Sequence, residues 1–391
     1  MAQAIIESAP QQLAIPAPRT TETHFSRLPS LDGWRAISIL LVLGCHATCA
    51  EGFPAVLTPV FNSIFDGNLG VRFFFIVSGF LITWLMLLEN AKNGSVSLRE
   101  FYIRRCLRIL PIYAVFLCVL AVLHFTGVGR ESTAAWTGNL TFTRNLQGSA
   151  TGGDAFSAHL WSLSIEEQFY LIWPVLFLLF RNQGERSLLG IIAFPILAAP
   201  AIRGMAAKWF YPGVFYPHML KPVFLGDSIF RYFDTLAFGC ACAVLLTYRR
   251  ESIEGVLKKY PWTTMITGIA LVLFPHYSSF LHLGVVTAAQ TIPSCQALGF
   301  SILLLHSVLA PDWICYRGLN WAWVRRIGIW SYSIYIWQQL FWPAPPYLGL
   351  NRVWWMGLWV IPLFAVTLLS YYGLERPFFK LRSRYREVKI A

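Results

Sequence analysis

Long apolar runs separated by short polar segments make up most of the 391-residue chain. A helix that crosses a bilayer needs roughly 20 mostly apolar residues, and about ten of these runs approach or exceed that length. Their approximate limits are 35–50, 71–89, 107–125, 162–180, 187–203, 229–247, 260–280, 284–309, 326–342 and 353–373. The pattern predicts an all-α, polytopic integral membrane protein with about ten transmembrane helices.

The basic residues fall unevenly on the loops between these predicted helices. When the N-terminus is placed inside, most of the 31 Lys and Arg residues lie on the inner side of the membrane. Because positive residues collect in cytoplasmic loops, we expect both termini to be cytoplasmic. This distribution also accounts for the net charge of +12 without a nucleic-acid partner.

Composition supports the membrane class and excludes others. Hydrophobic residues make up 56% of the chain and charged residues only 13%, whereas charged residues make up about 25% of soluble domains. A soluble module or nucleic-acid binder is therefore excluded, and the lipid bilayer is the expected environment. The eight cysteines show no zinc-ribbon or redox spacing, so we predict neither a metal site nor a bound cofactor.

Three segments divide the chain. Residues 1–30 are polar and rich in Pro, Gln, Ser and Thr, with no apolar core of a signal peptide, and we expect a disordered cytoplasmic tail. Residues 31–379 form one predicted transmembrane domain, followed by a basic cytoplasmic tail at 380–391. The longest predicted outer loop, 126–161, is a candidate lid or ligand-binding loop.

The first apolar run contains two ionisable side chains, Arg35 and His46. Eleven residues span about three helical turns, so both side chains share one face, with His46 roughly 16 Å above Arg35 along the axis. Ionisable groups at this depth are expensive and mark a functional cavity. The alternative is a histidine that only bonds a neighbouring helix. Cys45, beside His46, is an alternative nucleophile.

The third run begins with a cluster of basic residues in FYIRRCLRILPIYAV. Arg104 and Arg108 are four residues apart, and Arg105 and Arg108 three apart, so all lie on adjoining helical faces. Guanidinium groups bind phosphate through two parallel hydrogen bonds, which suits this cluster to a phosphorylated ligand. The alternatives are an ordinary cytoplasmic band of positive charge or a contact with anionic lipid headgroups.

The fourth run begins with AHLWSLSIEEQFYLIWP, which contains His159, Ser162, Glu166 and Glu167. Acidic residues suit a helix N-terminus, and capping explains one of the two carboxylates. The second is harder to explain so close to an apolar segment. A carboxylate that faces a buried imidazole would fix its tautomer and raise its basicity, so we predict that Glu166 or a nearby polar group orients His46.

Two further stretches combine polar and apolar residues. GVRFFFIVSGFLITW places Ser78 and Gly79 within a wall of aromatic residues, where small residues let helices approach closely. FRYFDTLAFG places Arg231 and Asp234 three residues apart, and we expect them to form an ion pair.

Four of these stretches, in order, resemble the motifs of the membrane-bound acyltransferase family 3, which includes bacterial polysaccharide O-acetyltransferases. LDGWRAISILLVLGCHA is similar to its Arg/Lys and His separated by ten residues, and FFFIVSGFL to its aromatic–Ser-Gly-Phe motif. YIRRCLRILP and WSLSIEEQFYLIWP are similar to its arginine-rich and Trp-Ser-Leu motifs. The resemblance extends from Leu31 to about Phe379.

The resemblance implies an acyl-CoA donor, usually acetyl-CoA, that enters from the cytoplasm, and a glycan acceptor on the outer side of a bacterial inner membrane. It also implies that His46 is catalytic. We expect the donor to bind Arg35, Arg104, Arg105 and Arg108, and His46 to act as general base with Glu166. Residues expected to line the cavity or contact the acceptor are Phe75, Ser78, His159, Trp161, Ser162, Glu167, Arg231 and Asp234.

Several alternatives stay open at this point. The reaction could pass through an acyl-His46 intermediate, and the acceptor could be a lipid, a macrolide or a lipooligosaccharide. The competing class is a non-catalytic transporter or flippase of a polysaccharide precursor, because an intramembrane histidine also serves proton-coupled export. The sequence makes no prediction of oligomeric state.

Overall fold

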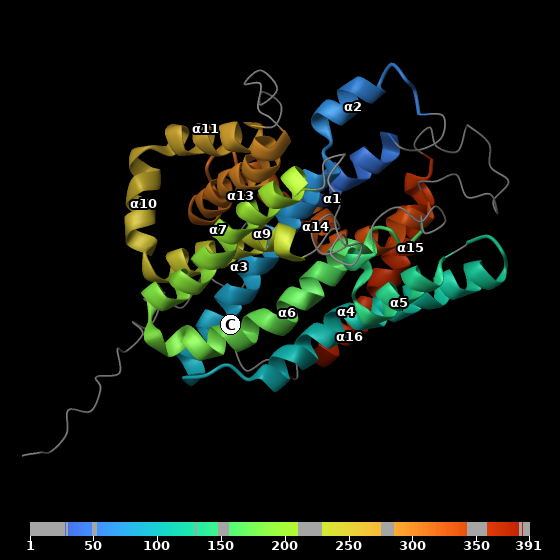
Figure 1. The fold of residues 1–391 in the computed structure, drawn as a ribbon, viewed down its shortest axis with the longest axis horizontal. Coiled ribbons are helices and arrows are strands. Elements are labelled where there is room, and N and C mark those ends of the chain that lie inside the picture. Colours follow the sequence, from blue (N-terminus) through green and yellow to red (C-terminus); the bar gives the residue numbers. More distant parts are fainter. Residues whose placement is uncertain are drawn as a thin grey trace, which may run out of the picture.

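The computed structural model describes residues 28, 30–48, 53–129, 131–147, 156–209, 229–274, 285–341, 358–382 and 385. Within these ranges the chain is helical and contains no strand, as predicted (Figure 1). The two predicted tails, 1–30 and 380–391, lie mostly outside the described residues.

The α-helices are α1 (Leu31–Thr48), α2 (Thr58–Ile64), α3 (Gly67–Asn93), α4 (Leu98–Phe125), α5 (Thr133–Thr141), α6 (Leu160–Phe180), α7 (Glu185–Trp209), α9 (Ile229–Tyr248), α10 (Arg250–Lys259), α11 (Pro261–Val272), α13 (Val285–Leu309), α14 (Ala322–Trp337), α15 (Val360–Ser370) and α16 (Arg376–Arg382). The short 3₁₀ segments are η1 (Arg144–Leu146), η2 (Arg181–Gln183), η4 (Arg317–Asn320) and η5 (Gln338–Leu340), and η7 (Tyr371–Glu375) is a π-helix.

Within the part of the chain that the structure describes, six helical segments are long and apolar enough to cross a membrane. They are Thr58–Asn93, Leu98–Phe125, Leu160–Gln183, Glu185–Ala207, Phe230–Tyr248 and Gln290–Leu309. Each coincides with a predicted apolar run. The remaining four runs contain the shorter helices α1, α11, α14 and α15. In its described part the chain is thus all-helical, with the helices of a multi-pass membrane protein, whereas ten spans and cytoplasmic termini stay predictions.

Local sequence explains how α3 and α4 form a helical hairpin. Asp66 caps α3 by accepting hydrogen bonds from the backbone N–H groups of Asn68 and Leu69 at 2.8 and 3.1 Å. Gly94 ends α3 in the left-handed conformation with φ of 71°, which glycine adopts without steric penalty. Ser97 then caps α4 through the N–H of Glu100 at 3.3 Å. The short connection between α3 and α4 reverses the direction of the chain.

Glycines set the close contact between α3 and α9. A Cβ added at Gly79 would lie 2.2 Å from the carbonyl oxygen of Leu236, and one added at Gly239 would lie 2.1 Å from that of Ile76. Both positions therefore require glycine for the two backbones to approach. The close helix contact predicted at Gly79 is confirmed.

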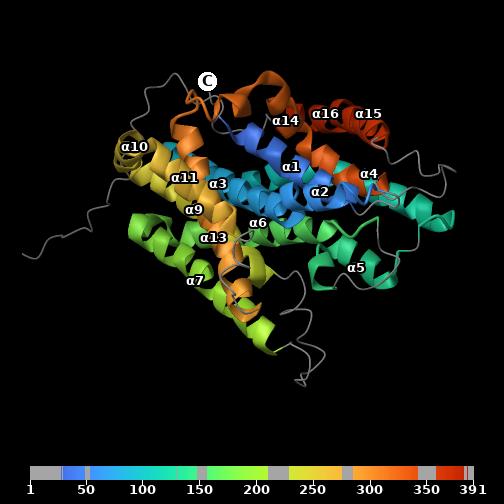
Figure 2. The ribbon, with the colours of Figure 1, turned by 90° about the horizontal axis from the view of Figure 1, so that it is seen from above.

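The helices form a bundle with α1 and α3 near its centre. α1 packs against α3 and α14, while α9 packs against α3 and α7. Figure 1 shows α10 at one end of the molecule and α5 at the other, and Figure 2 shows α7 and the α15–α16 segment at opposite edges. This arrangement brings α14 to the predicted catalytic helix, although the two are far apart in sequence.

Candidate active site

A cavity of about 100 Å³ lies among α1, α3, α4, α6 and α14; we call it the arginine cavity. The polar and ionisable residues in its lining are Arg35, Ser78, Arg105, Arg108, Ser162, Glu166, Tyr170, Ser331, Tyr332 and Tyr335. Phe75, also predicted as a cavity residue, lines it too. Three arginines face one glutamate, so the lining carries excess positive charge and suits an anionic ligand.

Aromatic and acidic neighbours hold the arginines in place. The Arg105 guanidinium lies over the rings of Tyr170 and Phe101, 5.3 and 5.6 Å from their centroids. Arg35 interacts electrostatically with Glu166 and with Glu375, a buried carboxylate on η7. The predicted donor-binding residues Arg35, Arg105 and Arg108 are therefore gathered in one place.

Arg104 does not join this group. Its guanidinium forms an ion pair with Glu89 on α3 at 2.7 Å and also donates to the backbone oxygen of Tyr385 at 3.1 Å. Arg104 shares a helical face with Arg108, but it lies one turn earlier along α4, beyond the lining of the cavity. The prediction that it binds the donor is replaced by a structural role between α3 and α4.

A second cavity, of about 300 Å³, contains the predicted catalytic histidine; we call it the histidine cavity. Its polar lining residues are Cys45, His46, Asn68, Arg144, Asn145, His159, Trp161, Tyr335 and Gln339. Trp161 and His159 thus lie beside His46 as predicted. Arg144 and Asn145 come from η1, within the predicted 126–161 loop.

The side chain that contacts His46 is a polar group other than Glu166. Its Nδ1 lies 3.1 Å from Oε1 of Gln338, which is fully buried on η5. With that amide oxygen as acceptor, Nδ1 carries the ring proton and Nε2 keeps a lone pair. Glu166 lies instead in the arginine cavity, where the hydroxyl of Tyr170 donates to it at 3.3 Å. A neutral amide from η5 therefore takes the role assigned to Glu166.

His159 is fixed from several sides. Its Nδ1 lies 2.9 Å from Oε1 of Gln339 and its Nε2 3.1 Å from the backbone oxygen of Ile336. The ring also makes an edge-to-face contact with Phe116. Both ring nitrogens of His159 are therefore engaged by groups of the chain, which disfavours His159 as the group that accepts a substrate proton.

Val71 and Tyr335 line both cavities and form the wall between them. The Tyr335 hydroxyl donates to the backbone oxygen of His159 at 2.9 Å and is hydrogen-bonded to Ser162. The wall is therefore held by α3 on one side and by α14 and α6 on the other. A ligand that extends from the arginine cavity to His46 must pass this wall.

The other predicted residues are divided between the arginine cavity and other parts of the bundle. Ser78 is hydrogen-bonded to Tyr170, so both hydroxyls face the arginine cavity together with Ser162. Glu167, Arg231 and Asp234 are absent from the described lining of either cavity. Their predicted role in contacting the acceptor is not supported by this placement.

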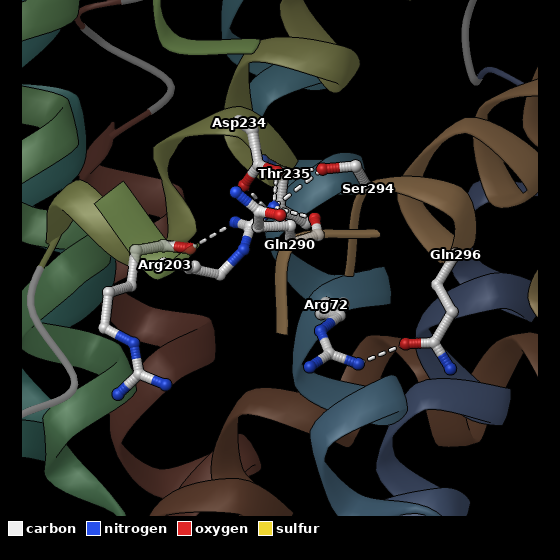
Figure 3. Close-up of polar contacts among 8 residues, drawn as sticks. Arg72, Arg203, Asp234, Thr235, Gln290, Ser294 and Gln296 are labelled. Carbon is white, nitrogen blue, oxygen red and sulfur yellow. Dashed lines mark hydrogen bonds and ion pairs between the residues drawn. The ribbon is translucent and has the colours of Figure 1, made fainter. Parts of the chain in front are cut away.

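The predicted ion pair between Arg231 and Asp234 is wrong. Asp234 pairs instead with Arg203 of α7 at 2.8 Å, and the Ser294 hydroxyl donates to the same carboxylate at 2.8 Å. Arg203 also donates to the backbone oxygen of Arg231 at 2.7 Å. Figure 3 shows this cluster apart from the hydrogen-bonded pair of Arg72 and Gln296.

Several residues of the site were not predicted. Gln338, Tyr335, Arg144 and Glu375 were not singled out in the sequence, although Arg144 lies in the 126–161 loop that was predicted as a candidate lid or ligand-binding loop. A signal was present in the run SYSIYIWQQ, where four polar residues occupy a predicted membrane segment. Among the described residues, no group of three or more His, Cys, Asp or Glu side chains is placed to hold a metal.

Comparison with known proteins identifies the fold that carries this site. The family model of the acyltransferase domain, acyltransferase 3, matches residues 28–374. The chain belongs to the acyltransferase 3 family. The motifs that resembled this family in the sequence contribute Arg35, Ser78, Arg105 and Arg108 to the arginine cavity and His46 to the histidine cavity. The matched family model describes an acyltransferase domain, which favours an acyltransferase over the transporter alternative.

Two of the curated relatives are named as peptidoglycan O-acetyltransferases. The chain is 27% identical to the peptidoglycan O-acetyltransferase OatA of Listeria monocytogenes over 92% of its own length and 57% of the relative. It is 26% identical to the putative peptidoglycan O-acetyltransferase YrhL of Bacillus subtilis over 90% of its length and 55% of that protein. The chain thus spans just over half the length of both relatives. No solved structure matches it.

Proposed function

We propose that the protein transfers an acyl group, in the first instance acetyl, from cytoplasmic acyl-CoA to a hydroxyl of an extracytoplasmic glycan across a bacterial inner membrane. The observation that carries this proposal is the adjacency of the two cavities along α1. One is lined by three arginines and the other by His46, with Val71 and Tyr335 common to both. The names of the peptidoglycan relatives support a glycan as the acceptor.

The donor fits the arginine cavity by charge and by length. Phosphates of CoA would bind Arg35, Arg105 and Arg108 through charge-assisted hydrogen bonds. The three helical turns between Arg35 and His46 correspond to roughly 16 Å, which is comparable to the length of the pantetheine arm. The thioester could then reach the histidine cavity while the nucleotide stays at the inner rim.

The transfer needs a base that removes the proton of the acceptor hydroxyl, and a route by which the acyl group reaches that hydroxyl. His46 Nε2 takes the proton of the acceptor hydroxyl as its oxygen attacks the thioester carbonyl. The tetrahedral intermediate collapses by cleavage of the C–S bond, and the proton on His46 passes to the departing CoA thiolate. His46 is thereby returned to its neutral form. Gln338 keeps the lone pair on Nε2 by accepting a hydrogen bond from Nδ1–H.

A direct assay tests the proposal. The purified full-length chain in lipid nanodiscs is incubated with acetyl-CoA labelled in the acetyl group and with soluble peptidoglycan fragments. Transfer of label to the glycan, with release of one CoA per acetyl group, supports the proposal. Absence of transfer to any glycan, in a preparation that binds acetyl-CoA, would contradict it.

Arg105→Gln and Arg108→Gln are each expected to raise the KM for acetyl-CoA by about 10- to 100-fold, because each removes a hydrogen bond to a charged group. Arg99→Gln serves as the matched control, since Arg99 lies on the same helix with its side chain 82% exposed. Steady-state kinetics at varied acetyl-CoA measure the effect. An unchanged KM for acetyl-CoA in both variants would mean that the donor does not bind in the arginine cavity.

The wall between the cavities should restrict the size of the acyl group. Val71→Ala removes bulk from this wall, and we expect the rate with butyryl-CoA relative to acetyl-CoA to rise about tenfold, as typical for added methylene groups in a tight pocket. Val71→Phe should lower transfer of both acyl groups while acyl-CoA binding, measured by calorimetry, is unchanged. A constant butyryl-to-acetyl ratio in Val71→Ala would mean that the acyl group takes another route.

A further inference from the structure

We propose that the arginine cavity recognises the phosphate that carries the pantetheine arm of the donor, so that the donor class is an acyl-phosphopantetheine thioester, with or without adenosine. This inference rests on the proposed function and names the part of the donor that the site selects. The wall, a stretch of apolar and hydroxyl side chains, and the arginines follow one another along the cavity in the order that such a donor requires.

Two close contacts show that α1 and α3 are antiparallel. A Cβ added at Gly67 of α3 would lie 3.1 Å from Sγ of Cys45. One added at Gly70 would lie 2.6 Å from the backbone oxygen of Ser38. Residue numbers thus fall along α1 as they rise along α3. The end of α1 that carries His46 therefore lies beside the beginning of α3.

One face of α3 lines the arginine cavity. The lining residues that recur at intervals of three or four are Val71, Phe74, Phe75, Ser78 and Ile82. Side chains at such intervals share one side of a helix, and the positions from Val71 to Ile82 rise roughly 16 Å. Val71 belongs to the wall beside the histidine cavity. The lining thus begins at this wall and extends away from His46 by a distance comparable to the length of a pantetheine arm.

The side chains along this face suit a pantetheine arm. Phenyl rings and aliphatic side chains of α3 provide an apolar surface for the dimethyl group of the arm. The hydroxyl groups of Ser78 and Ser162 also line the cavity, where they are hydrogen-bonded to Tyr170 and Tyr335. Because a hydroxyl group both donates and accepts hydrogen bonds, these groups can bond the amides of the arm without a charged side chain.

The arginines lie at the end of this lining that is distant from the wall. Arg105 and Arg108 lie near the beginning of α4, which the hairpin places beside the later part of α3. Within the described part of the chain, neither of them nor Arg35 donates a hydrogen bond. Glu166 and Glu375 act on Arg35 electrostatically. The guanidinium N–H groups are therefore available to the oxygen atoms of a phosphate.

The separation of these groups identifies the phosphate that they meet. Arg35 and His46 lie on one helix, roughly 16 Å apart along its axis. When the thioester lies at His46, the phosphate that carries the arm reaches the arginines, whereas adenosine and its 3′-phosphate extend beyond them. The basic residue that precedes the cavity on α4, Arg104, is already paired with Glu89 at 2.7 Å. The phosphate of the arm is therefore the group that the cavity selects.

The experiment compares four acetyl donors, with the full-length chain in nanodiscs and soluble peptidoglycan fragments as the acceptor. The donors are acetyl-CoA, acetyl-dephospho-CoA, acetyl-4′-phosphopantetheine and acetyl-pantetheine. We expect the first three to have kcat/KM values within about tenfold of one another, since each keeps the phosphate of the arm. Acetyl-pantetheine should be about 10²- to 10³-fold poorer, because it lacks every charge-assisted hydrogen bond to the arginines.

Variants of the cavity test the assignment to the arginines. In Arg105→Gln and Arg108→Gln, the advantage of acetyl-4′-phosphopantetheine over acetyl-pantetheine in kcat/KM should fall by about tenfold. Arg99→Gln is the matched control, because Arg99 lies on the same helix with its side chain 82% exposed, and it should keep the full advantage. An unchanged advantage in both cavity variants would overturn the inference.

The donor series separates this inference from the proposed function. A kcat/KM for acetyl-4′-phosphopantetheine as low as that for acetyl-pantetheine would overturn the inference and assign the arginines to the adenosine side of CoA. An equally large fall with acetyl-dephospho-CoA would also overturn it, because the 3′-phosphate would then be the recognised group. In both cases acetyl-CoA is still used and the acyltransferase function stands. Absence of transfer from acetyl-CoA to any glycan would instead refute the proposed function.

Discussion

Replacing His46 by glutamine should reduce acetyl transfer by about 10²- to 10⁴-fold, because the reaction loses its general base. Glutamine preserves much of the volume and polarity of the side chain, so the histidine cavity should keep its shape. Binding of acetyl-CoA should be unchanged, since the three donor-binding arginines line the other cavity. The effect is measured as kcat with labelled acetyl-CoA, beside the calorimetric affinity for the donor.

His124→Gln is the matched control for this substitution. His124 lies at the far end of α4, where its ring contacts Trp136, and it does not line either cavity among the described residues. This variant should retain wild-type activity. Normal transfer by His46→Gln would refute the mechanism. A variant that loses acetyl-CoA binding together with activity would show that His46 supports the structure instead of the chemistry.

The placement of Arg35 and His46 on one helix could be predicted from the sequence because it depends on local geometry alone. Arg35 and His46 lie on one continuous helix, so the helical repeat determines both their shared face and their separation. The clustering of Arg105 and Arg108 follows from the same rule. Predictions of this kind need no knowledge of which other helices are neighbours.

The partner of His46 could not be predicted in this way. Gln338 lies 292 positions away in the chain and reaches the ring only because α14, which precedes η5, packs against α1. Glu166 was the reasonable expectation, since it is acidic and lies in a recognised motif. The packing instead places it in the arginine cavity, among cations that compensate the charge of its half-buried carboxylate.

The errors at Arg104 and Asp234 share one physical cause. Helical spacing gives the side chains that share a face, but a partner from another helix can compete for each of them. Arg104 forms an ion pair with Glu89 and does not line the cavity, and Asp234 forms an ion pair with Arg203 and not with Arg231. Both competing partners were visible as charges inside or beside apolar runs. Pairing such charges across predicted helices, before considering neighbours on the same helix, would have corrected both assignments.

Breaking the pair of Arg203 and Asp234 should destabilise the protein more than any other single change outside the cavities. The side chains are 4% and 0% exposed, and their bond joins α7 to α9, while Ser294 adds α13. Removing one partner of such a pair leaves the other charge buried without compensation, which costs about 3–5 kcal/mol. Asp234→Asn and Arg203→Met should therefore each lower the apparent melting temperature in detergent, measured by loss of the monodisperse species on heating.

A double variant tests whether the single variants lose stability because one buried charge is left without its opposite charge. Replacing both residues by apolar ones, Arg203→Met with Asp234→Leu, removes both charges together and should recover most of the stability lost in the single variants. The surface pair of Arg250 and Glu254 is the matched control, because exposed i,i+4 pairs contribute only about 0.3–0.5 kcal/mol. If the double variant were as unstable as the two single variants combined, the pair would stabilise the bundle through specific hydrogen bonds to Ser294 and the Arg231 backbone, and charge compensation would not be the dominant effect.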